Sequence, residues 1–287
     1  MPLQVLPLLL DVLGWRALIE RRVRLIALFR IASIRQAINR LLPVANVGGD
    51  LVGIRLLAHA GVDGPSAAAS VIVELMIALG AQFLFAVAGG ACILMRSQDG
   101  RVLQGLALGS GVILPAFAAV IIVLRRGRIF SRVERRAIRH LGRWFEGFTA
   151  VNQGAALDSS ICGLFASSDR LLCSLGWQLA GLVAGSSETW VALHLLGHPV
   201  GIAAAIALES LIQAAKSALF MVPAGVGVQE VGLIGIGRWF GLDADVALAL
   251  SLAKRMREIL FGLPALAAWQ WIEGRRLTTQ VPVTRSP

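Results

Sequence analysis

Long runs of apolar residues are the feature that most limits what this chain can fold into. Several of them exceed the roughly 18 residues that a helix needs to cross a bilayer. Only 15% of the residues are charged, 56% are apolar and the mean hydropathy is +0.74, whereas a soluble domain is roughly a quarter charged. The sequence therefore predicts an all-α, polytopic integral membrane helix bundle. Its expected spans are 2–19, 66–95, 103–124, 171–196, 201–222 and 246–272.

The positive charges lie next to the apolar runs rather than in a separate basic domain. The chain has 27 Lys and Arg against 17 Asp and Glu, a formal net charge of +10. Arginines cluster at 21–24, 125–143 and 275–276. Short basic stretches beside spans are typical of cytoplasmic loops, and they attract anionic lipid headgroups. This clustering argues against a nucleic-acid partner and predicts that the basic segment 125–150 lies on the membrane surface.

The polar residues predict one membrane domain over 1–276, followed by a polar tail at 277–287. No long polar or Pro/Ser-rich linker divides the chain. The three cysteines and four histidines are scattered, so we predict no disulfide framework, no metal site and no cofactor. Ser, Cys and His do not combine with an acid or base at catalytic spacing. We therefore predict no catalytic residues and no enzymatic activity.

Two stretches, 41–74 and 221–254, come into register when the chain is shifted by 180 residues. The alignment needs no gap and predicts an internal repeat, although chance similarity is the alternative in a chain rich in Ala, Leu and Gly. The aligned pairs are Pro43 with Pro223, Asp50 with Glu230, Gly61 with Gly241, Asp63 with Asp243, and Glu74 with Lys254.

Both stretches have the composition of an interrupted, re-entrant helix. Proline removes a backbone donor, and glycine permits the positive φ that a chain reversal needs. Such backbone survives in a bilayer only when it is buried in protein or lines a wet cavity, so paired interruptions indicate a binding site. Asp50 and Glu230 either face this site or cap the restarted helices. The predicted helix-breaking residues are Pro43, Gly48, Gly49, Pro223, Gly225 and Gly227.

Charged and polar residues within the apolar runs form two stripes. Residues spaced by three, four or seven positions lie on one helix face. By this spacing, Arg255 faces away from the stripe formed by its neighbours Lys254, Arg257 and Glu258. Facing stripes would form a hydrophilic path through the protein. The stripes are Glu209, Gln213 and Lys216 in the first, and Lys254, Arg257 and Glu258 in the second.

Two interpretations of these charges remain open. In the first, they line a path for a lipid headgroup. In the second, they form buried structural ion pairs, Glu74 with Lys254 and Glu209 with either Lys216 or Arg257. Intramembrane ion pairs serve both purposes in proteins.

Three motifs resemble a known membrane family. They are NRLLPVANVGGDLVGIRLL at 39–57, VPAGVGVQEVG at 222–232 and LSLAKRMREILFGLPALAAWQ at 250–270. Over about 20–275 the chain is similar to the flippase-like family known from the transmembrane part of lysylphosphatidylglycerol synthase, and the wording of the motifs resembles its hopanoid-biosynthesis-associated branch. The resemblance implies a multi-pass protein of the bacterial inner membrane that moves or handles lipids, with the motif residues lining a cavity.

The resemblance also implies where lipid would bind, and the two stripes extend that set. The helix-breaking residues given above belong to the family motifs as well. The residues that the resemblance assigns to substrate binding are Asn39, Asp50, Arg55, Glu74, Gln229, Glu230, Lys254, Arg255 and Arg257. The stripes add Glu209, Gln213, Lys216 and Glu258.

The sequence thus favours a lipid translocase that handles a polar-headed lipid, either a hopanoid or an anionic phospholipid, through a polar cavity. The alternative is a non-transporting membrane subunit that scaffolds a lipid-biosynthesis enzyme and binds lipid-biosynthesis proteins. Two departures from the family pattern matter. No soluble aminoacyl-transfer domain follows Arg276, so lipid aminoacylation is not expected. Family members also carry an apolar helix before the one that begins here at Pro2, so the resemblance predicts a chain that is short at its N-terminus.

Overall fold

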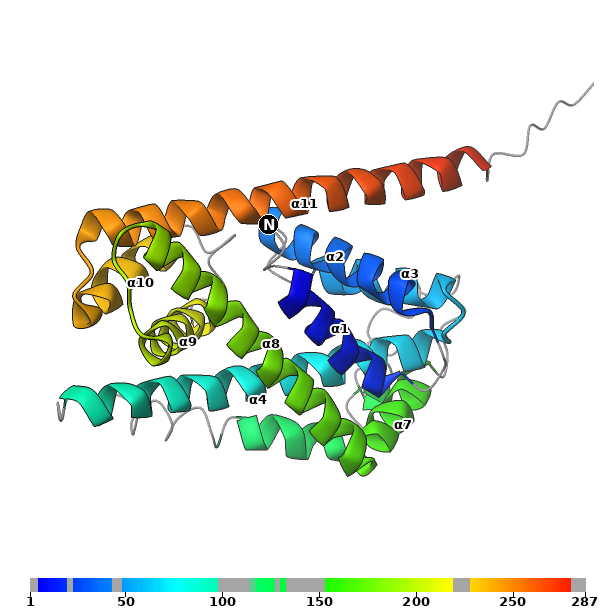
Figure 1. Cartoon of the computed structure of the whole chain (residues 1–287). Helices are drawn as coiled ribbons and strands as arrows, with labels where there is room; N and C mark the ends of the chain where they lie inside the picture. Colours follow the sequence, from blue (N-terminus) through cyan, green and yellow to red (C-terminus); the bar gives the residue numbers. More distant parts are fainter. Residues whose placement is uncertain are drawn as a thin grey trace, which may run out of the picture.

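The computed structural model describes residues 5–19, 23–42, 48–97, 115, 117–126, 130–132, 153–218 and 228–279. Every regular element in these ranges is a helix, which confirms the predicted all-α class. Figure 1 shows α11 along one edge, α4 along the opposite edge, and α8 crossing between them. The elements are α1 (Val5–Leu18), α2 (Leu25–Leu41), α3 (Gly48–His59), α4 (Gly64–Ser97), α7 (Gln153–Ala166), α8 (Ser168–Leu195), α9 (Ile202–Ala218), α10 (Val228–Gly237), η3 (Arg238–Phe240) and α11 (Ala244–Thr279).

The helix α4 is the most apolar long element of the described chain. Its 34 residues make a rod of roughly 51 Å, since a helix rises about 1.5 Å per residue. Among the described residues, Gly64–Cys92 is the one stretch long and apolar enough to cross a membrane, with a hydropathy of 2.2. Only 22% of its most apolar window is buried inside the protein. Leu75, Leu79 and Leu84 are exposed on its surface, where lipid would cover them.

Among the described residues the apolar core has three parts. One of them joins Leu18 of α1, Val73 of α4 and Ile161 of α7, and the other two lie in the first and second halves of the sequence. Val12 and Trp15 of α1 pack with Leu28 of α2 and Leu57 of α3 in the first half. In the second half, Leu193 of α8 packs with residues of α9, α10 and α11. Contacts of α1 with α8, of α4 with α9 and of α2 with α11 join the two halves. The long helices therefore bring residues from both halves of the sequence together at the centre.

Two tight turns connect short helices to long ones. Gly61 ends α3 with a φ of 94°, and Gly241 follows η3 with a φ of 73°. The next backbone N–H closes each turn, from Val62 to the carbonyl of Leu57 at 3.3 Å and from Leu242 to the carbonyl of Gly237 at 3.0 Å. This is the Schellman arrangement, which favours glycine because an L side chain is strained at positive φ. The helices on either side begin 180 residues apart, α3 and α10 at 48 and 228, and α4 and α11 at 64 and 244.

The structure corrects the predicted role of two glycines. Gly48 and Gly49 are not turn residues but lie in the first turn of α3. Gly49 is buried there, and a Cβ atom at this position would collide with the backbone carbonyl of Arg35 and the side chain of Asn39. The glycine therefore allows α2 and α3 to approach closely. The other predicted helix-breaking residues lie outside the described residues, namely Pro43, Pro223, Gly225 and Gly227.

Other predicted segments are described only in part. Most of the predicted span 103–124 and of the basic segment 125–150 lies outside the described residues. The structure places α7 in the range 151–168, for which the sequence predicts no element. At the C-terminal end, α11 continues to Thr279, three residues into the predicted tail.

Candidate functional site

Arg35 of α2 binds two carboxylates inside the first half of the bundle. Its Nη2 atom lies 2.8 Å from Oδ1 of Asp50 in α3 and 2.8 Å from Oε2 of Glu74 in α4, and its Nε donates to the same Asp50 oxygen at 3.2 Å. The three side chains are 11–13% exposed. Charge-assisted bonds of this length fix all three helices relative to one another. The cluster carries one positive and two negative charges.

An aromatic ring and a glycine hold the arginine in place. The guanidinium lies 4.5 Å from the centroid of the Trp15 ring, which is a favourable cation–π geometry. The indole N–H of Trp15 in turn donates to Oγ of Ser70 at 3.3 Å. Gly53 lies against the aliphatic part of Arg35, and a Cβ atom at that position would collide with it. Arg35 is therefore fixed on several sides, as a structural cation would be.

Asn39, rather than Asp50, satisfies the first turn of α3. The Oδ1 atom of Asn39 accepts a hydrogen bond from the backbone N–H of Gly49 at 2.8 Å. Asp50 lies in the same turn, where a negative charge is favoured by the helix dipole, but its carboxylate is bound to Arg35. The sequence interpretation of Asp50 as a side-chain cap is therefore wrong, and α2 supplies the capping group.

A second group of ion pairs joins α8, α9 and α11. Lys254 of α11 binds the carboxylate of Glu209 in α9, which also accepts a hydrogen bond from Thr189 Oγ1 of α8 at 2.5 Å. The Lys254 residue is 6% exposed. Three residues further along α11, Arg257 binds Glu188 of α8. The Nε atom of Arg257 is buried without a hydrogen-bond partner among the described residues.

Glu258 lies between two cations at a greater distance. Its Oε1 atom is 3.8 Å from Nη1 of Arg40 in α2 and 3.9 Å from Nζ of Lys216 in α9. The glutamate side chain is 9% exposed, whereas Arg40 is 36% exposed. Separations near 4 Å are ion pairs but not hydrogen bonds. This carboxylate is thus held more loosely than those of Glu74 and Glu209.

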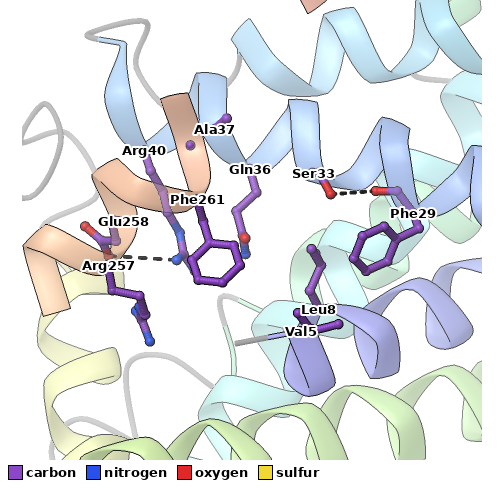
Figure 2. Close-up of a pocket in the computed structure, with 11 residues that line it drawn as sticks. Val5, Leu8, Phe29, Ser33, Gln36, Ala37, Arg40, Arg257, Glu258 and Phe261 are labelled. Atoms are coloured by element: carbon purple, nitrogen blue, oxygen red, sulfur yellow. Dashed lines mark hydrogen bonds and ion pairs between the residues drawn. The ribbon is translucent and has the colours of Figure 1, made fainter. Parts of the chain in front are cut away.

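A pocket of about 130 Å³ opens beside Glu258, between α1, α2 and α11. Figure 2 shows Arg40, Arg257 and Glu258 at one end of it, with Val5, Leu8 and Phe29 at the other. Gln36 and Phe261 lie between the two ends. Such a gradient from charged to apolar walls matches an amphiphilic molecule, whose headgroup and chain need different surroundings. The pocket is too small for a whole lipid, so it would hold the headgroup and the start of a chain.

The structure brings most of the predicted stripe residues together, but with different partners. The predicted pair Glu74–Lys254 is wrong, because Arg35 binds Glu74 and Glu209 binds Lys254. The predicted pairing of Glu209 with Lys216 or Arg257 is wrong for the same reason. The two stripes do face each other, through the pairs Glu209–Lys254 and Lys216–Glu258.

The remaining predicted residues that the structure describes are exposed or half-buried. Arg55 is exposed, and Gln213, Glu230 and Arg255 are half-buried. The side chain of Gln229 lies outside the described part of the chain.

The prediction did not include Arg35, Arg40, Thr189 or Glu188 among the site residues. Arg35 had a detectable signal, because it occupies the same helix face as Ile31 and Ile38, both of which are buried. An arginine within an apolar stripe needs a counter-ion.

An all-helical bundle with ion pairs buried between its helices is consistent with a membrane protein. The family model described as the lysylphosphatidylglycerol synthase TM region matches residues 2–265. The chain belongs to this family, and it is therefore a membrane protein related to lipid metabolism. Comparison with curated proteins and with solved structures gave no match.

Proposed function

We propose that this protein is a multi-pass translocase that carries a polar-headed lipid across the bacterial inner membrane without changing it chemically. The observation that carries this proposal is the pocket between α1, α2 and α11. Its charged end contains Arg40 and Glu258 and its apolar end contains Val5 and Phe29, so one molecule of lipid could place its headgroup and chain in suitable surroundings. The candidate lipids are an anionic phospholipid and a hydroxylated hopanoid.

The ion pairs divide into tight and loose ones, and the proposal assigns them different roles. A charge at the centre of a membrane helix costs about 2.5–3.5 kcal/mol on insertion scales, so each needs a partner or a function. Arg35 with Glu74 at 2.8 Å, and Lys254 with Glu209, are close pairs that hold helices together. Glu258, nearly 4 Å from both of its cations, is available for exchange. The structural and the functional interpretations of the stripes therefore both apply, to different residues.

Two helical hairpins, α3 with α4 and α10 with α11, support a transport fold. Helices α3 and α10 have 12 and 10 residues, so they are roughly 18 and 15 Å long. The hydrocarbon core of a bilayer is about 30 Å thick, and such short helices are suited to re-entrant segments rather than to spans. Each is followed by a glycine turn and a long helix at a spacing of 180 residues. We propose that these hairpins are the cores of an internal repeat, as paired re-entrant segments are in transporters.

Reconstituted liposomes test this function. Fluorescent phosphatidylglycerol or a fluorescent hydroxylated hopanoid is placed in both leaflets, and a membrane-impermeant reductant quenches the outer one. The wild-type protein should expose the inner lipid to quenching within minutes, and the lipid should be recovered intact by mass spectrometry. Arg257→Ala should slow the exposure of the inner lipid, because Arg257 lines the pocket and its loss leaves Glu188 without a counter-ion. The control is Arg30→Ala, an exposed residue of α2 that should behave as wild type.

The scaffold alternative predicts a different result. Wild-type liposomes would then quench like empty ones with every lipid, charge-removing substitutions would be tolerated, and a lipid-biosynthesis enzyme would co-purify. That outcome would contradict translocation.

A further inference from the structure

We propose that Asp11 of α1 is a proton-binding site that couples lipid movement to a proton gradient, and that the interface between α1 and α8 connects it to water. This inference rests on the proposed function and deepens it, because it names the energy source of the translocase. It is carried by three features of the described residues: a carboxyl group outside the ion-pair clusters, a row of unpartnered polar side chains, and an arginine shared with the pocket.

The ion-pair clusters are electrically balanced without Asp11. Among the described residues, the carboxyl group of Asp11 makes no ion pair and no hydrogen bond. Charges inside a membrane helix need a partner, and a carboxylate that has no cation to bind can compensate its charge by taking up a proton. The paired carboxylates are Asp50, Glu74, Glu188, Glu209 and Glu258, and the paired cations are Arg35, Arg40, Lys216, Lys254 and Arg257.

The side chain of Asp11 lies against the backbone of α8. Helices α1 and α8 pack along each other (Figure 1). A Cβ atom at Gly181 would lie 2.7 Å from Oδ1 of Asp11 and 3.4 Å from the carbonyl oxygen of Pro7. The carboxyl group therefore occupies the space that the glycine leaves. Asp11 is only partly buried, so a proton can reach it.

The α1–α8 interface continues from Asp11 as a row of polar side chains. Ser174, Gln178 and Gly181 lie on one face of α8 by their spacing of four and three positions. Opposite them is Gly14, where a Cβ atom would be 3.2 Å from the carbonyl oxygen of Ser174 and 3.6 Å from Cγ of Gln178. Both polar residues are buried, and neither side chain has a hydrogen-bond partner among the described residues. Buried polar groups are normally paired, so ordered water would join this row to Asp11.

The row leads to the end of the bundle where basic residues gather. Ser174 lies near the beginning of α8, and Gly14 lies near the end of α1. Arg16 is in the last turn of α1, and the arginines of the 21–24 cluster follow that helix in the chain. Basic residues beside membrane helices mark the cytoplasmic side. Asp11 would therefore exchange its proton with the cytoplasm through this interface.

Arg40 links the proton site to the pocket. In the described chain, the charged groups that act on Asp11 are Glu74 of α4 and Arg35 and Arg40 of α2, whereas the facing residues of α8 are uncharged. Arg35 is bound to two carboxylates, but Arg40 lies 3.8 Å from Glu258 at the charged end of the pocket (Figure 2). An ionised Asp11 competes with Glu258 for Arg40, and a protonated Asp11 does not. The proton and the charged end of the pocket thus bias each other, which is the condition for coupling.

Liposomes with a pH gradient test the coupling. The fluorescent phosphatidylglycerol and hopanoid of the translocation assay are added in trace amounts, and valinomycin with equal potassium on both sides holds the membrane potential at zero. Quenching then measures the labelled lipid in each leaflet at steady state. The wild-type protein should concentrate the lipid in one leaflet, by up to about tenfold per unit of pH difference when one proton moves with each lipid. Reversal of the gradient should reverse the accumulation.

Two matched pairs of variants locate the effect at Asp11. Asp11→Asn should leave the lipid equally distributed under either gradient, whereas Asp245→Asn, which removes an exposed carboxylate of α11, should behave as wild type. Gly181→Ala keeps every charge but displaces the Asp11 carboxyl group, so it should reduce the accumulation. Gly185→Ala, one turn further along α8, meets nothing within 4 Å and should not. Equal accumulation by the wild type and Asp11→Asn would overturn the inference.

Infrared spectroscopy of the purified protein in micelles detects the proton without any need for transport. Between acidic and alkaline pH, the wild-type protein should lose the C=O band of a protonated carboxylic acid that Asp11→Asn lacks. Thermal unfolding of both proteins shows whether the variant is folded. A pH-dependent spectrum that is identical in the wild type and a folded Asp11→Asn would overturn the proton site.

The two measurements also separate this inference from the proposed function. Lipid movement that no pH gradient biases, with no titrating band from Asp11, would uphold translocation and refute the coupling. A titrating band from Asp11 in a protein that moves no lipid would uphold the proton site and refute translocation.

Discussion

Glu74 is the eleventh residue of α4, and Lys254 is the eleventh residue of α11. Each makes a buried ion pair with a neighbouring helix, but the long helix supplies the acid in the first pair and the base in the second. Glu74 binds a cation of α2, whereas Lys254 binds an anion of α9. Both helices follow a short helix and a glycine at positive φ. The eleventh residue of each long helix thus makes an ion pair with a neighbouring helix. The charge on the long helix is negative in α4 and positive in α11.

Arg35→Ala should destabilise the protein strongly. The substitution leaves the carboxylates of Asp50 and Glu74 buried beside each other without a counter-ion, and loss of one partner of a buried pair costs about 3–5 kcal/mol. Thermal unfolding in detergent micelles would show this as a large fall in Tm. Arg30→Ala in the same helix is the control, because Arg30 is exposed and surface substitutions change stability by about 0.5 kcal/mol or less. Equal Tm values for the two variants would show that the Arg35 cluster does not stabilise the fold.

Gly49→Ala should separate α2 from α3. The added Cβ atom would meet the backbone carbonyl of Arg35, which cannot move aside without shifting a helix. Overpacking of this kind costs about 1–3 kcal/mol. The matched control is Gly163→Ala in α7, where a Cβ atom meets nothing within 4 Å. That substitution should stabilise the helix by up to about 1 kcal/mol, since alanine is the better helix former. Denaturation of both variants in the same detergent would give the comparison, and a destabilising Gly163→Ala would contradict it.

The long helices and the charges within them could be predicted from the sequence, because their signals are local. The glycine turns could not, since the predicted turn residues did not include Gly61 and Gly241, where the short helices end. The partners of the charges could not be predicted in the same way. Arg35 meets Asp50 and Glu74 only because α2, α3 and α4 pack together, across 15 and 39 residues of sequence. Chain order alone does not encode that packing.

The helix α7 is a short apolar helix that the sequence did not predict. Its sequence, QGAALDSSICGLFA, contains an aspartate and two serines, which lower the signal for a membrane helix. In the structure the carboxylate of Asp158 accepts hydrogen bonds from the backbone N–H groups of Phe130 and Ser131, at 3.2 and 3.0 Å. The polar residue is therefore satisfied by a segment 27 and 28 residues away. Only the tertiary structure shows that partner.

Gly241→Ala should lower stability by about 1–2 kcal/mol, the cost of a left-handed conformation for a residue with a Cβ atom. Nothing lies within 4 Å of the added atom, so strain in the backbone is the whole effect. Gly241→Asn should lose less, because asparagine tolerates this conformation better. Tm values of the three proteins in one detergent should therefore rank as glycine, asparagine, alanine. An alanine variant as stable as wild type would show that the turn can change its conformation.

Exchange of the two charges of the Glu209–Lys254 pair tests whether this position accepts an acid on the long helix, as the corresponding position in α4 does. Glu209→Lys alone would place two ammonium groups together, and Lys254→Glu alone would place two carboxylates together. Each single variant should lose about 3–5 kcal/mol, the amount associated with breaking a buried pair. The double variant restores one acid and one base, now with the acid on the long helix, as Glu74 is on α4. It should regain most of the lost stability, and the Thr189 hydroxyl, which donates to Glu209 in the native protein, can accept from the new lysine instead. A double-mutant cycle from Tm values in micelles measures the coupling. Additive losses in the double variant would show that the position depends on the identity of each residue and that the reversed polarity of the two pairs has no structural meaning.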